Sequence, residues 1–287
     1  KMINLWYEES YWGSGRSGPQ RVVTNTVEAL KQEHILYSVN EDKYQYNFLM
    51  QYQHDVALRK HEKLEHDTCL IGPQFWPFDS YGEFLICNQE YFKKIIAPSD
   101  WVYNLFTTKC GLSPDKVAVW SAGIQVLDIK SNPTVDCLIY HKGRSDNDLQ
   151  SAIEFLKKKK LSYMILKYGS YSPEEFYDCL SQVTFCFVID GTESQGIAIQ
   201  EMMAYNKPLF VWDVEEWNYM GDQYTVPASS VPYWTNNCGK RFFDLSGMKD
   251  SFDEFYDNIN YYESKKIIET ELSYSHSVKK LINIFEE

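Results

Sequence analysis

Residues 183–201, from Val183 to Glu201, read VTFCFVIDGTESQGIAIQE and contain the clearest indication of the fold. The apolar run at 183–189 predicts a buried strand, and residues 195–205 predict a helix. The short turn between them begins at Gly191, and Gly196 lies at the start of the predicted helix. Such a turn exposes the amides of the first helical turn, and these amides together with the helix dipole favour a bound diphosphate. We therefore predict a phosphate-binding strand, turn and helix.

Two carboxylates accompany this turn. Glu193 precedes the predicted helix, and Glu201 lies within it eight positions later. From Gln195, the first residue of the predicted helix, to Glu201 is about one and a half turns, so Glu201 lies about 9 Å along the helix axis. A carboxylate suits a sugar diol because it accepts two hydrogen bonds, so one could meet the sugar of a nucleotide sugar and the other its ribose. The alternative is a helix-start charge at Glu193 and a solvated side chain at Glu201.

Strands and helices alternate on both sides of this stretch. Towards the C-terminus, strands are predicted at 137–141, 163–167 and 208–212, and helices at 146–158, 172–180, 251–262 and 275–285. Towards the N-terminus, strands are predicted at 3–7, 35–39, 95–98 and 117–119, helices at 19–33 and 101–110, and strand or loop at 84–88. This alternation predicts an α/β fold with two Rossmann-like, doubly wound parallel sheets that face a cleft.

A linker separates the two series at residues 130–134, where Asn132-Pro133 interrupts the pattern. We predict an N-terminal Rossmann-like domain at 1–134 and a C-terminal nucleotide-sugar-binding domain at 135–265. The segment 266–287 is predicted to be a helix that crosses back to the N-terminal domain.

A second glycine-rich loop, Gly13-Ser14-Gly15-Arg16-Ser17-Gly18, matches the pattern G-x-G-x-x-G and lies between a predicted strand and helix. One interpretation is a dinucleotide fingerprint with Glu41 or Asp42 as its carboxylate. However, the strand ends several residues too early for that tight turn, and Arg16 would crowd a pyrophosphate. A flexible loop and a substrate-binding loop that lines the cleft are the other interpretations, and we favour the last.

Composition limits the partners and the compartment. The formal net charge is −12, whereas a nucleic-acid binder carries a basic face, so we expect no nucleic-acid partner. The basic run at 157–160 predicts a solvated helix end, with peripheral contact to anionic lipid as the alternative. Seven cysteines without a C-x-x-C pair indicate reduced thiols. We find neither a transmembrane stretch nor a signal peptide, and we expect a cytoplasmic protein.

The segment from Glu193 to Glu201 resembles the E-x7-E motif of retaining glycosyltransferases with the two-domain GT-B fold, in particular family 4. The following residues 203–209, MAYNKPL, resemble the family's E-A-M-A-x-G-x-P-V ending. Further similarities lie in PSDWV at 98–102, WSAGI at 120–124, the loop at 13–21 and the helix at 274–285. The resemblance therefore covers most of the chain.

The resemblance implies a role for each part of the site. Lys142 and Arg144 would hold the donor diphosphate and offset the charge of the leaving group, with Lys167 as another possible partner, and Glu193 would meet the sugar. The implied donor-binding residues are Ser194, Gln195, Gly196, Ile197, Glu201, Tyr168 and Gly169. The implied acceptor-side loop consists of Gly13, Ser14, Gly15, Arg16 and Gly18. No metal site and no cofactor are expected, since the nucleotide-diphosphate sugar is a substrate.

The predicted function is that of a glycosyltransferase, a hexosyl- or pentosyltransferase that moves a sugar to a glycan or another hydroxyl acceptor. The resemblance implies a retaining, metal-independent reaction. Two other functions remain open at this point: a transferase-like subunit that binds nucleotide sugar without chemistry, and a dinucleotide-dependent oxidoreductase that uses residues 13–18.

Overall fold

The computed structural model describes residues 2–8, 17–41, 46–51, 68–128 and 132–287. The chain forms two compact units: unit 1 contains residues 1–123 and 272–287, and unit 2 contains residues 124–271. The sequence prediction places the boundaries after residues 134 and 265, whereas the units divide after residues 123 and 271.

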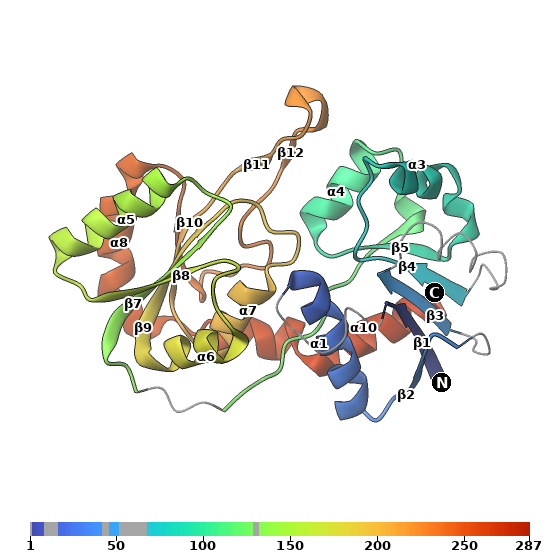
Figure 1. Cartoon of the computed structure of the whole chain (residues 1–287), viewed down its shortest axis with the longest axis horizontal. Coiled ribbons are helices and arrows are strands. Elements are labelled where there is room, and N and C mark those ends of the chain that lie inside the picture. Colours follow the sequence, from blue (N-terminus) through green and yellow to red (C-terminus); the bar gives the residue numbers. More distant parts are fainter. Residues whose placement is uncertain (1, 9–16, 42–45, 52–67, 129–131) are drawn as a thin grey trace. The chain divides into compact units, whose positions relative to one another are not determined.

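Unit 1 is built on a six-stranded parallel sheet with the order β2-β1-β3-β4-β5-β6 (Figure 1). Its strands are β1 (Met2–Tyr7), β2 (Leu36–Val39), β3 (Tyr46–Gln51), β4 (Cys69–Ile71), β5 (Lys94–Ala97) and β6 (Val117–Val119). Its helices are α1 (Gly18–Gln32), α3 (Ser80–Cys87), α4 (Asp100–Thr108) and α10 (Tyr274–Glu286). The strand-or-loop prediction for residues 84–88 is wrong over most of its length. The Asp79 side chain caps α3 there by accepting the Gly82 amide at 2.7 Å.

The C-terminal helix α10 is part of unit 1. The indole Nε1 of Trp120 donates to the Ser277 carbonyl at 2.9 Å, and the Ser277 hydroxyl donates to the Ser121 carbonyl at 2.8 Å. A Cβ on Gly123 would lie 2.8 Å from the Tyr274 Cα, so only glycine allows this approach. Packing of residues 120–123 against α10 therefore explains why the unit ends at Gly123.

Unit 2 contains a five-stranded parallel sheet with the order β13-β10-β9-β7-β8 (Figure 1). Its strands are β7 (Val135–Lys142), β8 (Tyr163–Lys167), β9 (Val183–Asp190), β10 (Leu209–Trp212) and β13 (Gly239–Phe242), with a separate hairpin of β11 (Glu216–Trp217) and β12 (Val226–Pro227). Its helices are α5 (Asp146–Lys159), α6 (Pro173–Gln182), α7 (Ile197–Ala204), α8 (Leu245–Asp257) and the short α9 (Lys265–Ile267). The chain leaves β7 for β8 on one side and then returns to β9 on the other. The two central strands therefore form a topological switch point.

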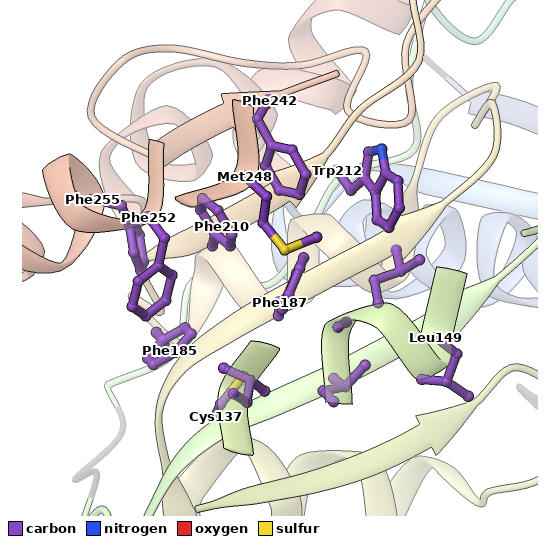
Figure 2. Close-up of a cluster of buried hydrophobic side chains, with 14 residues drawn as sticks. Cys137, Leu149, Phe185, Phe187, Phe210, Trp212, Phe242, Met248, Phe252 and Phe255 are labelled. Carbon is purple, nitrogen blue, oxygen red and sulfur yellow. The ribbon is translucent and has the colours of Figure 1, made fainter. Parts of the chain in front are cut away.

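Alternate side chains of β9 fill the core of unit 2. Phe185, Phe187 and Ile189 are buried on one face of the sheet, together with residues of α5 and α8 (Figure 2). Phe210 stacks on Phe242 with ring centroids 4.7 Å apart. Strands buried on both faces read as continuous apolar runs, which is why β7 and β9 were recognisable in the sequence. This packed core fixes the carboxyl ends of the strands, where the polar residues begin.

Candidate functional site

The carboxyl ends of β7 and β9 lie side by side at the switch point, where ligands bind in open α/β sheets. Lys142 ends β7, Asp190 ends β9, and the two residues are paired in register. The Gly191 amide donates to the Lys142 carbonyl at 3.1 Å. A Cβ on Gly143 would lie 3.3 Å from the Gly191 nitrogen, so the two chains are closely packed as they leave the sheet.

Lys142 and Glu193 form an ion pair across this point. The Lys142 ammonium also lies over the Tyr168 ring, 4.5 Å from its centroid, in a cation–π arrangement. Burial lowers the pKa of Lys142, but the acidic groups of Glu193 and Asp190 outweigh burial and leave that pKa above its ordinary value. The lysine is therefore a permanent cation beside a carboxylate.

Arg144 has its own contacts near this pair. Its Nε donates to Asp148 Oδ2 at 3.0 Å, and its guanidinium lies 4.5 Å from the centroid of the Trp212 ring. Asp148 belongs to the first turn of α5, which Ser145 caps. Arg144 is thus anchored between α5 and the end of β10. The alternative cation Lys167 instead pairs with Asp146 at 2.9 Å.

The loop before α7 holds Glu193 by its backbone. The Glu193 amide donates to the Ser229 carbonyl at 3.2 Å. Gly196 adopts a left-handed conformation with φ 80°, which suits glycine, and is followed by the first residue of α7, Ile197. Gln195 and Gln200 are buried and bonded to each other at 3.1 Å, whereas Ser194 is exposed. These contacts fix the turn that presents the amide end of α7.

Glu201 lies in α7, nearly buried, and accepts the hydroxyl of Tyr177 at 2.9 Å. Tyr177 belongs to α6 and stacks on Tyr205 with an interplanar angle of 3°. This donor from α6 orients the Glu201 carboxylate.

The turn after β8 contains Tyr168 and Gly169. The Tyr168 amide donates to the His141 carbonyl at 3.0 Å, which ties the turn to β7. Tyr168 is exposed, and Gly169 has φ 80° with no atom within 4 Å of a Cβ position. The turn therefore presents backbone and an aromatic ring to open space beside Lys142.

Two buried aspartates belong to this edge and were missed in the sequence analysis. Asp190 closes β9 and Asp213 directly follows β10, and both are about 1% exposed. Asp213 accepts the hydroxyls of Ser229 and Ser230, and so fixes the loop that holds Glu193. The available signal was an acidic residue directly after each apolar strand.

Of the predicted acceptor-side loop, Gly13, Ser14, Gly15 and Arg16 lie outside the described residues. Gly18 is the first residue of α1, whose N-terminus is closed by a capping box between Ser17 and Gln20. In the described part of the chain no group of three or more His, Cys, Asp or Glu side chains could hold a metal ion. Within that same part, every helix is too short or too polar to cross a bilayer.

No protein-family model matches the sequence, and no curated protein sequence matches it significantly. Solved structures do resemble it. The lipopolysaccharide outer core galactosyltransferase WaaB, in its apo form, has a TM-score of 0.60 at 11% identity, over 100% of this chain and 99% of WaaB. Sucrose-phosphate synthase from Thermosynechococcus elongatus has a TM-score of 0.60 at 9% identity, over 100% of this chain and 98% of the synthase.

A mutant of S. aureus TarM, solved with fondaparinux, α-GlcNAc-glycerol and UDP, has a TM-score of 0.58 at 13% identity over 91% of this chain. The match covers 58% of TarM, so the chain spans just over half of that protein's length. These likenesses extend over nearly the whole chain and include both parallel sheets. The chain therefore has the fold of the GT-B glycosyltransferases.

Proposed function

We propose that this protein is a glycosyltransferase that takes a sugar from a nucleotide-diphosphate donor and passes it to a hydroxyl group of a glycan or a similar acceptor. The donor would bind at the carboxyl edge of the unit 2 sheet. Unit 1 would supply the acceptor side, with residues 13–18 as a substrate-binding loop.

The contact between Lys142 and Glu193 carries this proposal, because it joins a cation and a carboxylate at the switch point of the sheet. A diphosphate leaving group gains negative charge as the bond to the sugar breaks, and a fixed cation stabilises that charge. The carboxylate beside it can accept two hydrogen bonds from a sugar diol. The pair thus suits a diphosphate–sugar linkage better than it suits either part alone.

The remaining site residues fit the rest of a nucleotide sugar. The amides at the start of α7, from Ser194 to Ile197, would bind the diphosphate, helped by the positive end of the helix dipole. Arg144 would add a second cation. Glu201, oriented by Tyr177, would accept ribose hydroxyls, and the base would lie at the Tyr168–Gly169 turn.

We further propose that the reaction is retaining and independent of metal and of any cofactor. Lys142, Arg144 and the start of α7 would together replace a divalent cation as the source of positive charge. The protein would act in the cytoplasm, and the alternative to a solvated helix end at residues 157–160 is peripheral contact with anionic lipid. Lys159 of that run is paired with Asp253.

The test is binding and turnover with purified protein. UDP, GDP, ADP and CDP, each alone and as sugar conjugates, are screened by thermal shift; a ligand at a hundred times its dissociation constant stabilises the fold by about 2.7 kcal/mol. Release of the nucleotide from the conjugate that binds is then measured with water or a glycan as acceptor.

Glu193→Ala should lower turnover on the order of a hundredfold, because it removes a contact to the reacting sugar. Glu201→Ala should mainly weaken nucleotide binding. Glu154→Ala is the matched control, since Glu154 is an exposed glutamate of α5. Full turnover in Glu193→Ala, or failure of the wild type to bind any of these nucleotides, would overturn the proposal.

A further inference from the structure

Asp190 is a buried acidic residue at the end of an apolar strand. It ends β9, whose preceding residues from 185 to 189 are completely buried, and it is itself 1% exposed. Its backbone is held in register with Lys142, and the neighbouring Gly143 packs so closely that a Cβ there would lie 3.4 Å from Asp190 Oδ1. The carboxyl group therefore cannot reach bulk water.

The surroundings of Asp190 do not support a buried carboxylate. Its Oδ2 has no hydrogen-bond partner among the described residues. The charged and titratable groups that act on it are Lys142 from β7, Glu193 from the following loop, and the phenols of Tyr140 and Tyr171. The one cation among these groups is already paired with Glu193. An ionised carboxylate with an unpartnered buried oxygen is far less favourable than a neutral acid.

A proton on Asp190 removes both difficulties. A protonated Oδ2 becomes a donor, and the adjacent Glu193 carboxylate is the acceptor. Glu193 would then receive one hydrogen bond from the Lys142 ammonium and one from Asp190, which fixes its orientation from two sides. The three groups together would carry no net charge, whereas three ionised groups would carry an extra negative charge against an incoming diphosphate.

We propose that Asp190 is a neutral carboxylic acid in the working enzyme, donates its proton in a hydrogen bond to Glu193, and so positions that carboxylate for the donor sugar. The positioning role rests on the function proposed above, but the protonation state does not. In agreement, burial, followed by the charge of Glu193, raises the pKa of Asp190 to about 9, and Lys142 offsets only part of this.

The first experiment measures stability against pH and needs no substrate. The unfolded chain ionises Asp190 near its ordinary pKa of 3.8, whereas the folded protein holds the proton to about pH 9. Between pH 3.8 and about pH 9 the folded state therefore binds one proton more than the unfolded state. The contribution of Asp190 to the free energy of unfolding is complete below pH 3.8 and is lost as the pH rises to about 9.

Urea unfolding of the whole chain is therefore compared between the wild type and Asp190→Asn from pH 5 to pH 8. The unfolding equilibrium constant of the wild type, divided by that of Asp190→Asn, should rise about tenfold per pH unit. Asp250→Asn is the control, because Asp250 has a side chain that is 91% exposed, and its ratio should stay constant. A constant ratio for Asp190→Asn would mean that the native group is ionised, which overturns the proposal.

An infrared measurement covers the case in which Asp190→Asn does not fold. The wild type should show the carbonyl stretch of a protonated carboxylic acid at neutral pH, and this band should disappear as the pH passes through about 9. A band that is absent at neutral pH would again contradict a neutral Asp190.

The second experiment addresses positioning. Asp190→Ala should lower turnover on the order of tenfold or more with a smaller change in KM, because Glu193 loses a fixed partner. Asp190→Asn should restore the greater part of that loss, since an amide can also donate, and it should remove the decline of the wild-type rate above pH 9. Equal rates in Asp190→Ala and the wild type would overturn the positioning role. A wild type without any turnover would instead contradict the proposed function, while the unfolding and infrared results still decide the proton.

Discussion

Asp190 and Asp213 occupy equivalent places in the unit 2 sheet and have opposite surroundings. They directly follow the register pair Ile189 and Trp212 of the neighbouring strands β9 and β10, and both are about 1% exposed. Asp213 accepts the amides of Val214 and Ser230, the hydroxyls of Ser229 and Ser230, and the guanidinium of Arg241 at 3.2 Å. Asp190 has an oxygen without a partner in the described chain and another acid beside it.

The difference shows that burial alone does not decide what a carboxyl group does. Donors from the loop after β12 and from β13 satisfy Asp213, and these contacts hold the loop that contains Ser229. The Ser229 carbonyl in turn accepts the Glu193 amide. Asp190 does not hold a loop in this way. Buried polar groups that do not stabilise the fold are typical of functional sites. Asp213 therefore supports the candidate site from outside, whereas Asp190 is part of it.

The largest effect should come from removing the satisfied aspartate. Asp213→Ala leaves Arg241 and two serines without their acceptor, and it should lower the free energy of unfolding by about 3–5 kcal/mol. Urea unfolding at pH 7.5 measures this loss. Asp190→Ala is the matched variant and should cost clearly less, because it removes one hydrogen bond to Glu193 and not a carboxylate that several donors share. Equal losses in the two variants would remove the distinction between them.

The next effect concerns Lys142, the cation that is paired with Glu193. Lys142→Gln should weaken binding of the nucleoside diphosphate by about ten- to a hundredfold, because a charge-assisted contact to phosphate is lost. Calorimetric titration measures the dissociation constant. Lys167→Gln is the control, since Lys167 pairs with Asp146 on the exposed side of the turn. A larger loss for Lys167→Gln would move the diphosphate site to that lysine.

A smaller effect is expected from the close packing above Asp190. Gly143 has φ 66°, and a Cβ there would approach both Gly191 and Asp190. Gly143→Ala should therefore lower the free energy of unfolding by roughly 1–3 kcal/mol. Gly169→Ala has a similar φ of 80° but open space around it, so it should show the conformational cost alone. Similar losses in both variants would show that the packing above Asp190 is not restrictive.

The smallest effect should come from removing one of the hydrogen-bond donors of Asp213. Ser229→Ala removes one hydroxyl that contacts both carboxyl oxygens at 2.9 and 2.8 Å, while the amides and Arg241 remain. The free energy of unfolding should fall by about 1 kcal/mol. A loss as large as that of Asp213→Ala would mean that this hydroxyl alone satisfies the carboxylate.

Much of the fold could be predicted because apolar runs mark the buried strands. The run at 183–189 corresponds to β9, and the helix predicted at 146–158 corresponds to α5. Strands β3 and β13 of the parallel sheets were missed, as were the short hairpin strands β11 and β12. β3 lies in a polar neighbourhood, and β13 buries only the first and last of its four residues, so neither presents a clear apolar run. α3 was assigned to strand or loop because its cap at Asp79 was not recognised.

The site was only partly predictable for a different reason. Glu193 was singled out from its own neighbourhood and Lys142 through the family resemblance. The two residues are 51 positions apart, and only the pairing of β7 with β9 brings them together. Asp190 and Asp213 look alike in the sequence, each an acid after an apolar strand. The donors of Asp213 come from residues 214, 229, 230 and 241, most of them far along the chain.

The alternating α/β pattern could be predicted from the sequence, and so could the turn between β9 and α7 with Glu193 in the turn and Glu201 in the helix. These features depend on periodicity and turn chemistry, which act between near neighbours in the chain. The folded chain was needed to show that Asp213 is surrounded by hydrogen-bond donors whereas Asp190 lies beside another acid. A buried carboxyl group finds its hydrogen-bond donors in segments that are distant in the chain, and the sequence around the carboxyl group does not indicate which segments these are.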